Sequence, residues 1–209
     1  MILTKEKILD KLESGGLAFE PQIDKFQLQS HSVDLRLGFT FMIPKIWRMT
    51  DKGRQSVHLS PLQDLSQEYF DIIELEKGQF FELLPQEHIM VSTFERVKIP
   101  HNLMAVLYPR SSTNRKGLSL DLTGIIDAGY EGQLILPIRN NTRSQVITLY
   151  PGERFCQIIF DELTNKVRVH KSKYHNVDII EGVASDKKIE TNLILKGEIE
   201  KIKENFKIS

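Results

Sequence analysis

The chain has 209 residues, and its 28 basic and 28 acidic side chains give a formal net charge of zero, which predicts no overall attraction to nucleic acid. The single cysteine, Cys156, excludes an intrachain disulfide and indicates a reducing, cytoplasmic setting, in which we expect this thiol to lie in the core. Because no apolar run approaches ~18 residues and no signal-peptide pattern opens the chain, we expect no membrane partner.

The first elements can be placed from capping residues and helix breakers. Thr4 is positioned to cap a short helix that runs to about Glu13, with its apolar residues on one face. The run Ser14-Gly-Gly ends that helix. Residues 32–38 alternate polar and apolar side chains, which predicts a strand that ends at Gly38.

Residues 44–71 carry weaker signals, and their role stays open. Pro44-Lys-Ile-Trp-Arg-Met followed by Asp51-Lys-Gly-Arg predicts a hairpin with an Asp-x-Gly turn. We interpret Trp47 as a packing residue rather than a platform for stacking a base.

From Phe70 onward, short β-branched or aromatic runs alternate with Gly, Pro and Asn turn signals. This spacing predicts a mainly β fold, a distorted antiparallel β-barrel or jelly-roll. We expect one β domain over residues 1–163 and a partly helical tail over residues 164–209. In that tail, apolar residues from Leu193 to Phe206 predict an amphipathic helix with Gly197 as its weak point. The tail either docks and stabilises an oligomer or is a frayed, solvated helix.

Two stretches carry the chemistry, Tyr108-Pro-Arg-Ser-Ser-Thr-Asn-Arg and Gly124-Ile-Ile-Asp-Ala-Gly-Tyr-Glu-Gly. The first places a guanidinium beside two hydroxyl groups, a donor set suited to phosphate oxygens. The second carries one carboxylate into a glycine-flanked turn, followed by an aromatic ring. Together they favour a nucleotide site that hydrolyses its ligand. The alternative is that the first stretch is only a polar turn and the second only a hairpin bend, because both use the same residue types.

These two stretches resemble the phosphate-binding and catalytic motifs of the trimeric dUTPase and dCTP deaminase superfamily. Residues 27–38, Gln-Leu-Gln-Ser-His-Ser-Val-Asp-Leu-Arg-Leu-Gly, are similar to its opening signature, and Pro151-Gly-Glu-Arg-Phe-Cys-Gln resembles its Gly-x-x-x-x-Gln element. The matches follow the family's order from near residue 1 to about residue 163. The resemblance implies a dUTPase-like fold and a homotrimer whose active sites are shared, with Ser111 and Asp127 meeting across subunits.

The resemblance also implies roles for individual residues. Asp127 would be the catalytic base that deprotonates the water attacking the α-phosphorus, and Tyr130 would pack on the deoxyribose. Asp34 would be a structural acid near the metal and phosphates, an indirect metal contact. The remaining substrate-binding residues implied are Arg110, Ser111, Ser112, Arg115 and Gln157.

The expected metal is Mg2+, held mainly by phosphate oxygens and water. The six histidines are scattered and form no His/Cys cluster at zinc-ligand spacing, so the sequence does not support a zinc-dependent deaminase.

Two chemistries compete within this superfamily. The deaminase branch uses a glutamate expected at position 137, where this chain has Pro137, and the nearby Glu131 falls out of register with that position. We therefore expect a dUTP diphosphatase that yields dUMP and pyrophosphate. The alternatives are a dCTP deaminase, monofunctional or bifunctional, a catalytically silent nucleotide-binding relative, and a purely structural trimer module. The tail lacks the closing motif of ordinary dUTPases, although Lys173-Tyr-His lies near the place of the deaminase closing pattern.

Overall fold

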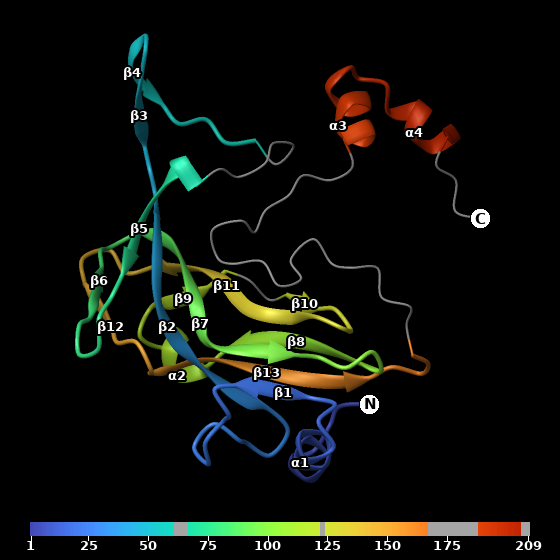
Figure 1. Ribbon diagram of the computed structural model, residues 1–209. Coiled ribbons are helices and arrows are strands. Elements are labelled where there is room, and N and C mark those ends of the chain that lie inside the picture. Colours follow the sequence, from blue (N-terminus) through green and yellow to red (C-terminus); the bar gives the residue numbers. More distant parts are fainter. Residues whose placement is uncertain (61–66, 122–123, 167–187, 206–209) are drawn as a thin grey trace.

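The computed structural model describes residues 1–60, 67–121, 124–166 and 188–205. Within these ranges the chain is mainly β, and its main sheet is a curled antiparallel half-barrel (Figure 1). The nine described strands of this sheet run in the order β10-β8-β13-β2-β7-β11-β9, with β1 added to β7 and β5 added to β2. The predicted barrel-like β fold is confirmed.

Five strands form the centre of the sheet: β2 Val33–Pro44, β7 His88–Lys98, β8 Leu103–Pro109, β11 Glu131–Asn140 and β13 Arg154–Glu162. Shorter strands lie around them: β1 Ala18–Glu20, β5 Phe70–Glu74, β9 Leu118–Leu120 and β10 Ile125–Ile126. Two small two-stranded sheets pair β3 Trp47–Thr50 with β4 Gly53–Ser56, and β6 Phe81–Leu83 with β12 Ile147–Leu149. The helices are α1 Lys5–Glu13, α2 Ser111–Asn114, α3 Lys188–Leu195 and α4 Ile199–Asn205, with a 3-10 turn at Gln67–Tyr69.

Gly38 lies in the middle of β2, so the prediction that the strand ends there is wrong. A Cβ atom at this position would lie 2.2 Å from Oγ of Ser92 and 2.9 Å from the carbonyl oxygens of Ser92 and Thr93. The glycine therefore marks a close approach of β2 to its partner β7, at the irregularity in their register between Leu37 and Phe41, rather than a chain reversal. Because the strand continues, β2 runs through the whole body of the protein (Figure 1).

Inward-facing residues alternate along the central strands and form one core. In β11 the buried positions are Gly132, Leu134, Leu136, Ile138 and Asn140. Cys156 in β13 is fully buried, as expected, and burial raises the pKa of its thiol well above the usual value. This thiol is therefore a small core residue without nucleophilic character at neutral pH.

The hairpin β3–β4 has the predicted Asp-x-Gly turn and projects away from the barrel (Figure 1). Trp47 is 45% exposed, and the Arg54 guanidinium lies 4.8 Å from the centre of its ring. The interpretation of Trp47 as a packing residue is therefore wrong. A two-stranded arm has no second layer to cover the ring, so the contact with Arg54 is a cation–π pair at the surface.

The helices agree with the sequence at the N-terminus and differ in the tail. Thr4 precedes α1 as its N-cap residue, as predicted. The tail holds α3 and α4 rather than one helix, because the chain turns at Gly197, which has a φ of +72°. None of the helices in the described ranges has the length and apolar character needed to span a membrane.

Candidate active site

Asp34 lies at the centre of an ion-pair cluster formed where β8, β13 and β2 run side by side. Its Oδ2 atom lies 3.1 Å from Nε of Arg110 and 3.2 Å from Nη1 of Arg154. The Asp34 side chain is 3% exposed, whereas those of Arg110 and Arg154 are 26% and 30% exposed. Burial raises the pKa of the Asp34 carboxyl, against the opposing pull of the two guanidinium groups. The cluster therefore presents two partly exposed cations above one buried carboxylate.

Asp34 is held in place by a second buried acid, Glu95 of β7. The side-chain amide of Gln27 donates to the Asp34 carbonyl oxygen at 2.9 Å and to Oε1 of Glu95 at 2.7 Å. The other carboxylate oxygen of Glu95 accepts a hydrogen bond from the Arg36 backbone N–H at 2.9 Å. These bonds fix β2 against β7 beneath the cations, and burial raises the pKa of the Glu95 carboxyl.

The residues of the Arg-Ser-Ser motif follow directly from the end of β8. Arg110 precedes α2, and its Nη1 atom donates to the carbonyl oxygen of Arg154 at 2.9 Å. Ser111 and Ser112 open α2 with exposed side chains, and Arg115, also exposed, ends it. The motif thus points two hydroxyl groups and a second cation toward solvent beside the cluster.

Gln157 joins this group through strand pairing. In β13 it lies opposite Tyr108 of β8 on one side and opposite Asp34 of β2 on the other. Its side-chain amide lies 3.5 Å from the Pro109 carbonyl oxygen, at the limit of hydrogen-bond distance. The fold therefore brings Asp34, Arg110 and Gln157 together, although they are far apart in the sequence.

Asp127 and Tyr130 lie on the turn between β10 and β11. Ile126 is buried while Ile125 is 70% exposed, and Asp127 projects from the turn with an exposed side chain. Tyr130 is only 8% exposed, and its hydroxyl donates to the Gln133 carbonyl oxygen at 2.6 Å. Burial raises the pKa of Tyr130 to about 12, so the ring stays neutral.

Within one chain, Asp127 and the Arg-Ser-Ser motif lie at opposite ends of β8. Strand β10 runs antiparallel to β8, with Ile125 opposite Val106 and Ile126 opposite Ala105. Asp127 therefore continues toward Met104, and at about 3.3 Å per residue the strand from there to Arg110 spans ~20 Å. A site that uses both Asp127 and Arg110 cannot be completed within a single chain.

Pro137 lies in β11 opposite Met90 of β7, and its carbonyl oxygen accepts the Asp121 backbone N–H at 2.9 Å. It stands just past the β9 ladder, which ends at the pair of Ile138 with Leu120. Glu131 is ~20 Å away along the same strand and forms an ion pair with Lys98 at 3.4 Å. Within one chain, Glu131 is not placed to act at position 137.

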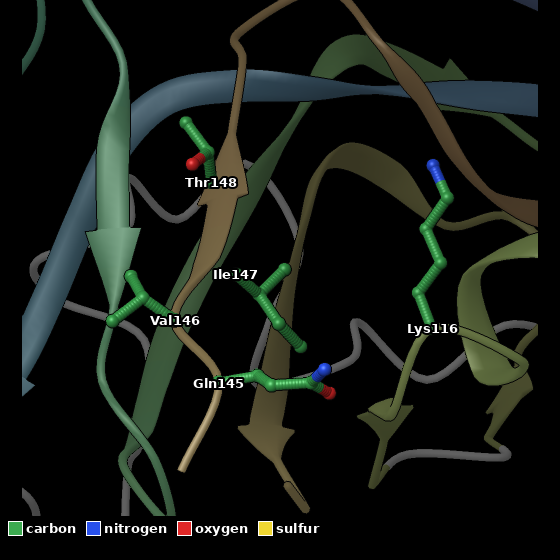
Figure 2. Close-up of a pocket in the computed structure, with 5 residues that line it drawn as sticks. All are labelled: Lys116, Gln145, Val146, Ile147 and Thr148. Atoms are coloured by element: carbon green, nitrogen blue, oxygen red, sulfur yellow. The ribbon is translucent and has the colours of Figure 1, made fainter.

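A shallow pocket of about 480 Å³ lies beside the motif rather than on it. Figure 2 shows its lining, Lys116 facing the segment of Gln145, Val146, Ile147 and Thr148. The candidate site residues described above do not line this pocket.

Sequence reasoning missed Arg154, Gln27 and Glu95. Arg154 lies inside the 151–157 motif, but its pairing with Asp34 spans 120 residues and needed the sheet order to be seen. Glu95 had a signal, because it is a charged residue at an inward position of an alternating strand. Residues 173–175, which lie near the place of the deaminase closing pattern without clearly matching it, are outside the described ranges.

The chain is similar to known proteins in both sequence and structure. The sequence pattern of the dCTP deaminase-like family matches residues 2–163. The chain is 41% identical over 183 residues to "dCTP deaminase, dUMP-forming" of Dictyoglomus thermophilum, covering 84% of this chain and 90% of that protein. It is 34% identical over 164 residues to the protein of the same name in Methanobrevibacter smithii, covering 78% and 81%.

Among solved structures, the 2'-deoxycytidine 5'-triphosphate deaminase of Agrobacterium tumefaciens is similar, with a TM-score of 0.58 and 25% identity. That match covers 76% of this chain and 47% of the other, so the present chain spans about half of that longer protein. The family pattern and the relatives at 41% and 34% identity together show that the chain belongs to the dCTP deaminase-like family.

Proposed function

We propose that this chain is an enzyme that converts dCTP to dUMP, releasing ammonia from the base and pyrophosphate from the triphosphate. The observation that carries the proposal is its 41% identity to a dUMP-forming dCTP deaminase over 84% of the chain. The site geometry supports the phosphate half of this reaction directly, because cations and hydroxyl groups gather at the end of β8.

The triphosphate is assigned to the Arg-Ser-Ser end of the site. Arg110 supplies a charge-assisted donor, and the exposed hydroxyl groups of Ser111 and Ser112 add neutral donors. Gln157 contributes its side-chain amide from the adjacent strand, and Arg115 is a second cation at the site or at a subunit interface. Alanine at position 110 should weaken nucleotide binding by about 1.5–3 kcal/mol, the range for a hydrogen bond to a charged group.

Asp127 is assigned as the general base for attack of water on the α-phosphorus, and it reaches the phosphates of a neighbouring subunit. The ~20 Å separation within one chain supports sites shared between subunits, and the family resemblance makes the proposed oligomer a homotrimer. Light scattering tests the oligomer, and a fully active monomer would overturn it.

Tyr130 is assigned to the sugar. Its edge packs on deoxyribose and leaves no space for a 2'-hydroxyl, so UTP should be turned over far more slowly than dUTP. Equal turnover of the two would show that the ring only fills the corner of the hairpin, as its burial and its bond to Gln133 allow.

In this proposal the ligands of Mg2+ come mainly from the nucleotide rather than from the protein. The described residues contain no cluster of three or more His, Cys, Asp or Glu side chains able to hold a metal, and the Oδ2 atom of Asp34 already meets two guanidinium groups. In this proposal the ion is bound mainly by phosphate oxygens and water, with Asp34 acting only indirectly. Bound there, it would offset phosphate charge.

A second candidate is a dUTP diphosphatase without deaminase activity. The observation that favours it is Pro137, which has no proton to transfer at the position where the deaminase branch uses glutamate. If dCTP is the substrate, a group other than residue 137 must carry the proton. Glu131 of the same chain is not placed to do so, because it lies ~20 Å away.

One assay separates the candidates. The protein is incubated with Mg2+ and either dCTP or dUTP, and dUMP, pyrophosphate and ammonia are quantified over time. The proposal expects all three products from dCTP. Pyrophosphate and dUMP from dUTP alone would establish the second candidate, and no product from either nucleotide would indicate a silent binding relative.

A further inference from the structure

The carboxylate of Asp34 serves two cations with one oxygen. Its Oδ2 atom is 3.1 Å from Nε of Arg110 and 3.2 Å from Nη1 of Arg154. Arg110 is assigned above to the nucleotide, and Arg154 has no role there. The cluster therefore contains one more positive charge than the carboxylate balances.

Asp34 cannot follow Arg110 if that side chain moves toward a ligand. Its backbone N–H donates to the Gln27 carbonyl oxygen at 2.8 Å, and its own carbonyl accepts the Gln27 side chain at 2.9 Å. Gln27 is in turn held by buried Glu95 at 2.7 Å. The carboxylate is a fixed point, whereas Arg110 is partly exposed and must exchange its contacts with Asp34 and with the Arg154 carbonyl oxygen to reach a ligand.

How readily Arg110 can move away from Asp34 depends on whether another cation still neutralises the Asp34 carboxylate. A buried carboxylate that loses its last cation is strongly destabilised, because it is neither solvated nor paired. If Arg110 were the sole partner of Asp34, any phosphate contact that drew Arg110 away would leave the buried Asp34 carboxylate unpaired and destabilise the protein. With Arg154 remaining on the same oxygen, this destabilisation is avoided.

We propose that Arg154 is a positioning residue for nucleotide binding: it keeps Asp34 neutralised, so that the guanidinium of Arg110 can turn to the triphosphate. The inference rests on the proposed function in one respect, the assignment of phosphate to Arg110. The competing account is purely structural, because Arg154 also donates to the Phe26 carbonyl oxygen and so anchors the loop before β2.

The test measures binding of the non-hydrolysable analogue α,β-imido-dUTP with Mg2+ by calorimetry, beside KM and kcat for the substrate. Arg154→Met should weaken binding and raise KM about tenfold, the loss of one charge-assisted contact, with kcat within about twofold. Adding Asp34→Asn to this variant removes the buried charge and should restore affinity to within about threefold.

Arg154→Lys tests neutralisation directly, because it keeps a positive charge where the Nη1 atom of Arg154 contacts Asp34 and the Phe26 carbonyl oxygen. Nucleotide affinity should therefore stay within about threefold of wild type. The matched control is Arg48→Met, which removes an arginine paired with Glu68 on the hairpin and should not change affinity.

The outcomes are distinguishable. Unchanged affinity in Arg154→Met, or a double variant no better than Arg154→Met, would overturn the inference while leaving the proposed function intact. A lower melting temperature in Arg154→Met and Arg154→Lys alike, with affinity unaffected, would establish the anchoring role instead. Failure of the wild-type protein to bind the analogue would count against the assignment of the triphosphate to Arg110 and so against the inference, whereas the proposed function is judged separately by product formation from dCTP.

Discussion

The side-chain amide of Gln27 donates to Oε1 of Glu95 across 2.7 Å in the protein interior, where Glu95 is 1% exposed. The second oxygen of Glu95 accepts the Arg36 backbone N–H. Both carboxylate oxygens are thus acceptors for fixed donors of β2 and the loop before it, and the acid contributes no exposed surface. Glu95 therefore belongs to the framework of the site, and its ionisation links that framework to pH.

Stability should fall as pH rises through the titration of Glu95. Burial raises the pKa of Glu95 above the unfolded value of 4.5, so the folded state binds the proton more tightly than the unfolded state does. The stability that this proton contributes is therefore fully present only below the unfolded pKa. The unfolding free energy, measured in denaturant titrations, should therefore decline as pH rises from the unfolded pKa of 4.5 through the raised pKa of the folded state. Glu95→Gln should lack this decline and should be less stable by about 1–3 kcal/mol, because one donor is left unpaired. Glu82→Gln, an exposed change on β6, should behave as wild type, and a parallel pH profile for Glu95→Gln would refute the prediction.

Asp127→Asn should abolish turnover while keeping nucleotide binding. The amide keeps the shape of the side chain but cannot take a proton from water, so kcat should drop about 10²–10⁴-fold at nearly unchanged analogue affinity. Asp71→Asn is the matched control, since Asp71 is an exposed acid paired with Lys45 at 3.1 Å and should retain full activity. A tenfold loss of affinity in Asp127→Asn, with kcat preserved, would assign the residue to binding instead.

Two variants that are each impaired at a nucleotide concentration well below KM should regain activity when they are mixed. Arg110→Ala and Asp127→Asn damage opposite ends of β8, and in a shared site one chain supplies each end. Subunits denatured and refolded together should form some sites with both wild-type residues, and activity should rise above that of either parent. Refolding each variant alone is the control. No gain after verified subunit exchange would mean that the site lies within one chain.

Gly38→Ala should destabilise the sheet by at least about 1–3 kcal/mol, because the added methyl meets Ser92 and Thr93 of β7. Combining it with Ser92→Ala removes the nearest contact, at 2.2 Å, but leaves two carbonyl oxygens at 2.9 Å, so recovery should be partial. Gly16→Ala is the control, since its nearest neighbours lie 3.8 Å away. Thermal unfolding measures all three, and a neutral Gly38→Ala would mean that the two strands separate readily.

Pro137→Glu should raise the ratio of dCTP to dUTP turnover. The change places a proton carrier where the deaminase branch has one, at a half-buried position of β11. Pro137→Gln has the same length without the charge and should leave the ratio unchanged. Equal ratios in both variants would show that residue 137 does not govern deamination in this chain.

Local patterns in the sequence were sufficient to predict the fold class. Alternating runs and turn signals predicted a mainly β chain after Phe70, and Thr4 marked the start of α1. The prediction at Gly38 was wrong because the sequence alone does not distinguish a glycine at a chain reversal from one where a strand closely approaches its partner. Trp47 misled for a related reason, since a hairpin pattern does not tell whether a second layer covers it.

The motifs of the candidate site could be predicted from the sequence, but the contacts between residues distant in the sequence could not. Arg110 and Gln157 were singled out by resemblance, and the sheet places both beside Asp34. The role of Arg154 depends on a contact with Asp34 across 120 residues, which no local pattern encodes. The meeting of Ser111 with Asp127 depends on a second chain, so it stays a prediction.

The arm formed by β3 and β4 leaves and rejoins the sheet at one place. Pro44, the last residue of β2, lies opposite Phe70, the first residue of β5, and the next backbone N–H, of Lys45, donates to the Tyr69 carbonyl oxygen at 2.8 Å. Because these contacts close the ladder at the base of the excursion, we expect the register of β2 with β5 to survive a change in the length or sequence of the β3–β4 hairpin. The position is a natural graft point, where a reporter loop or an affinity epitope could be carried outside the catalytic body.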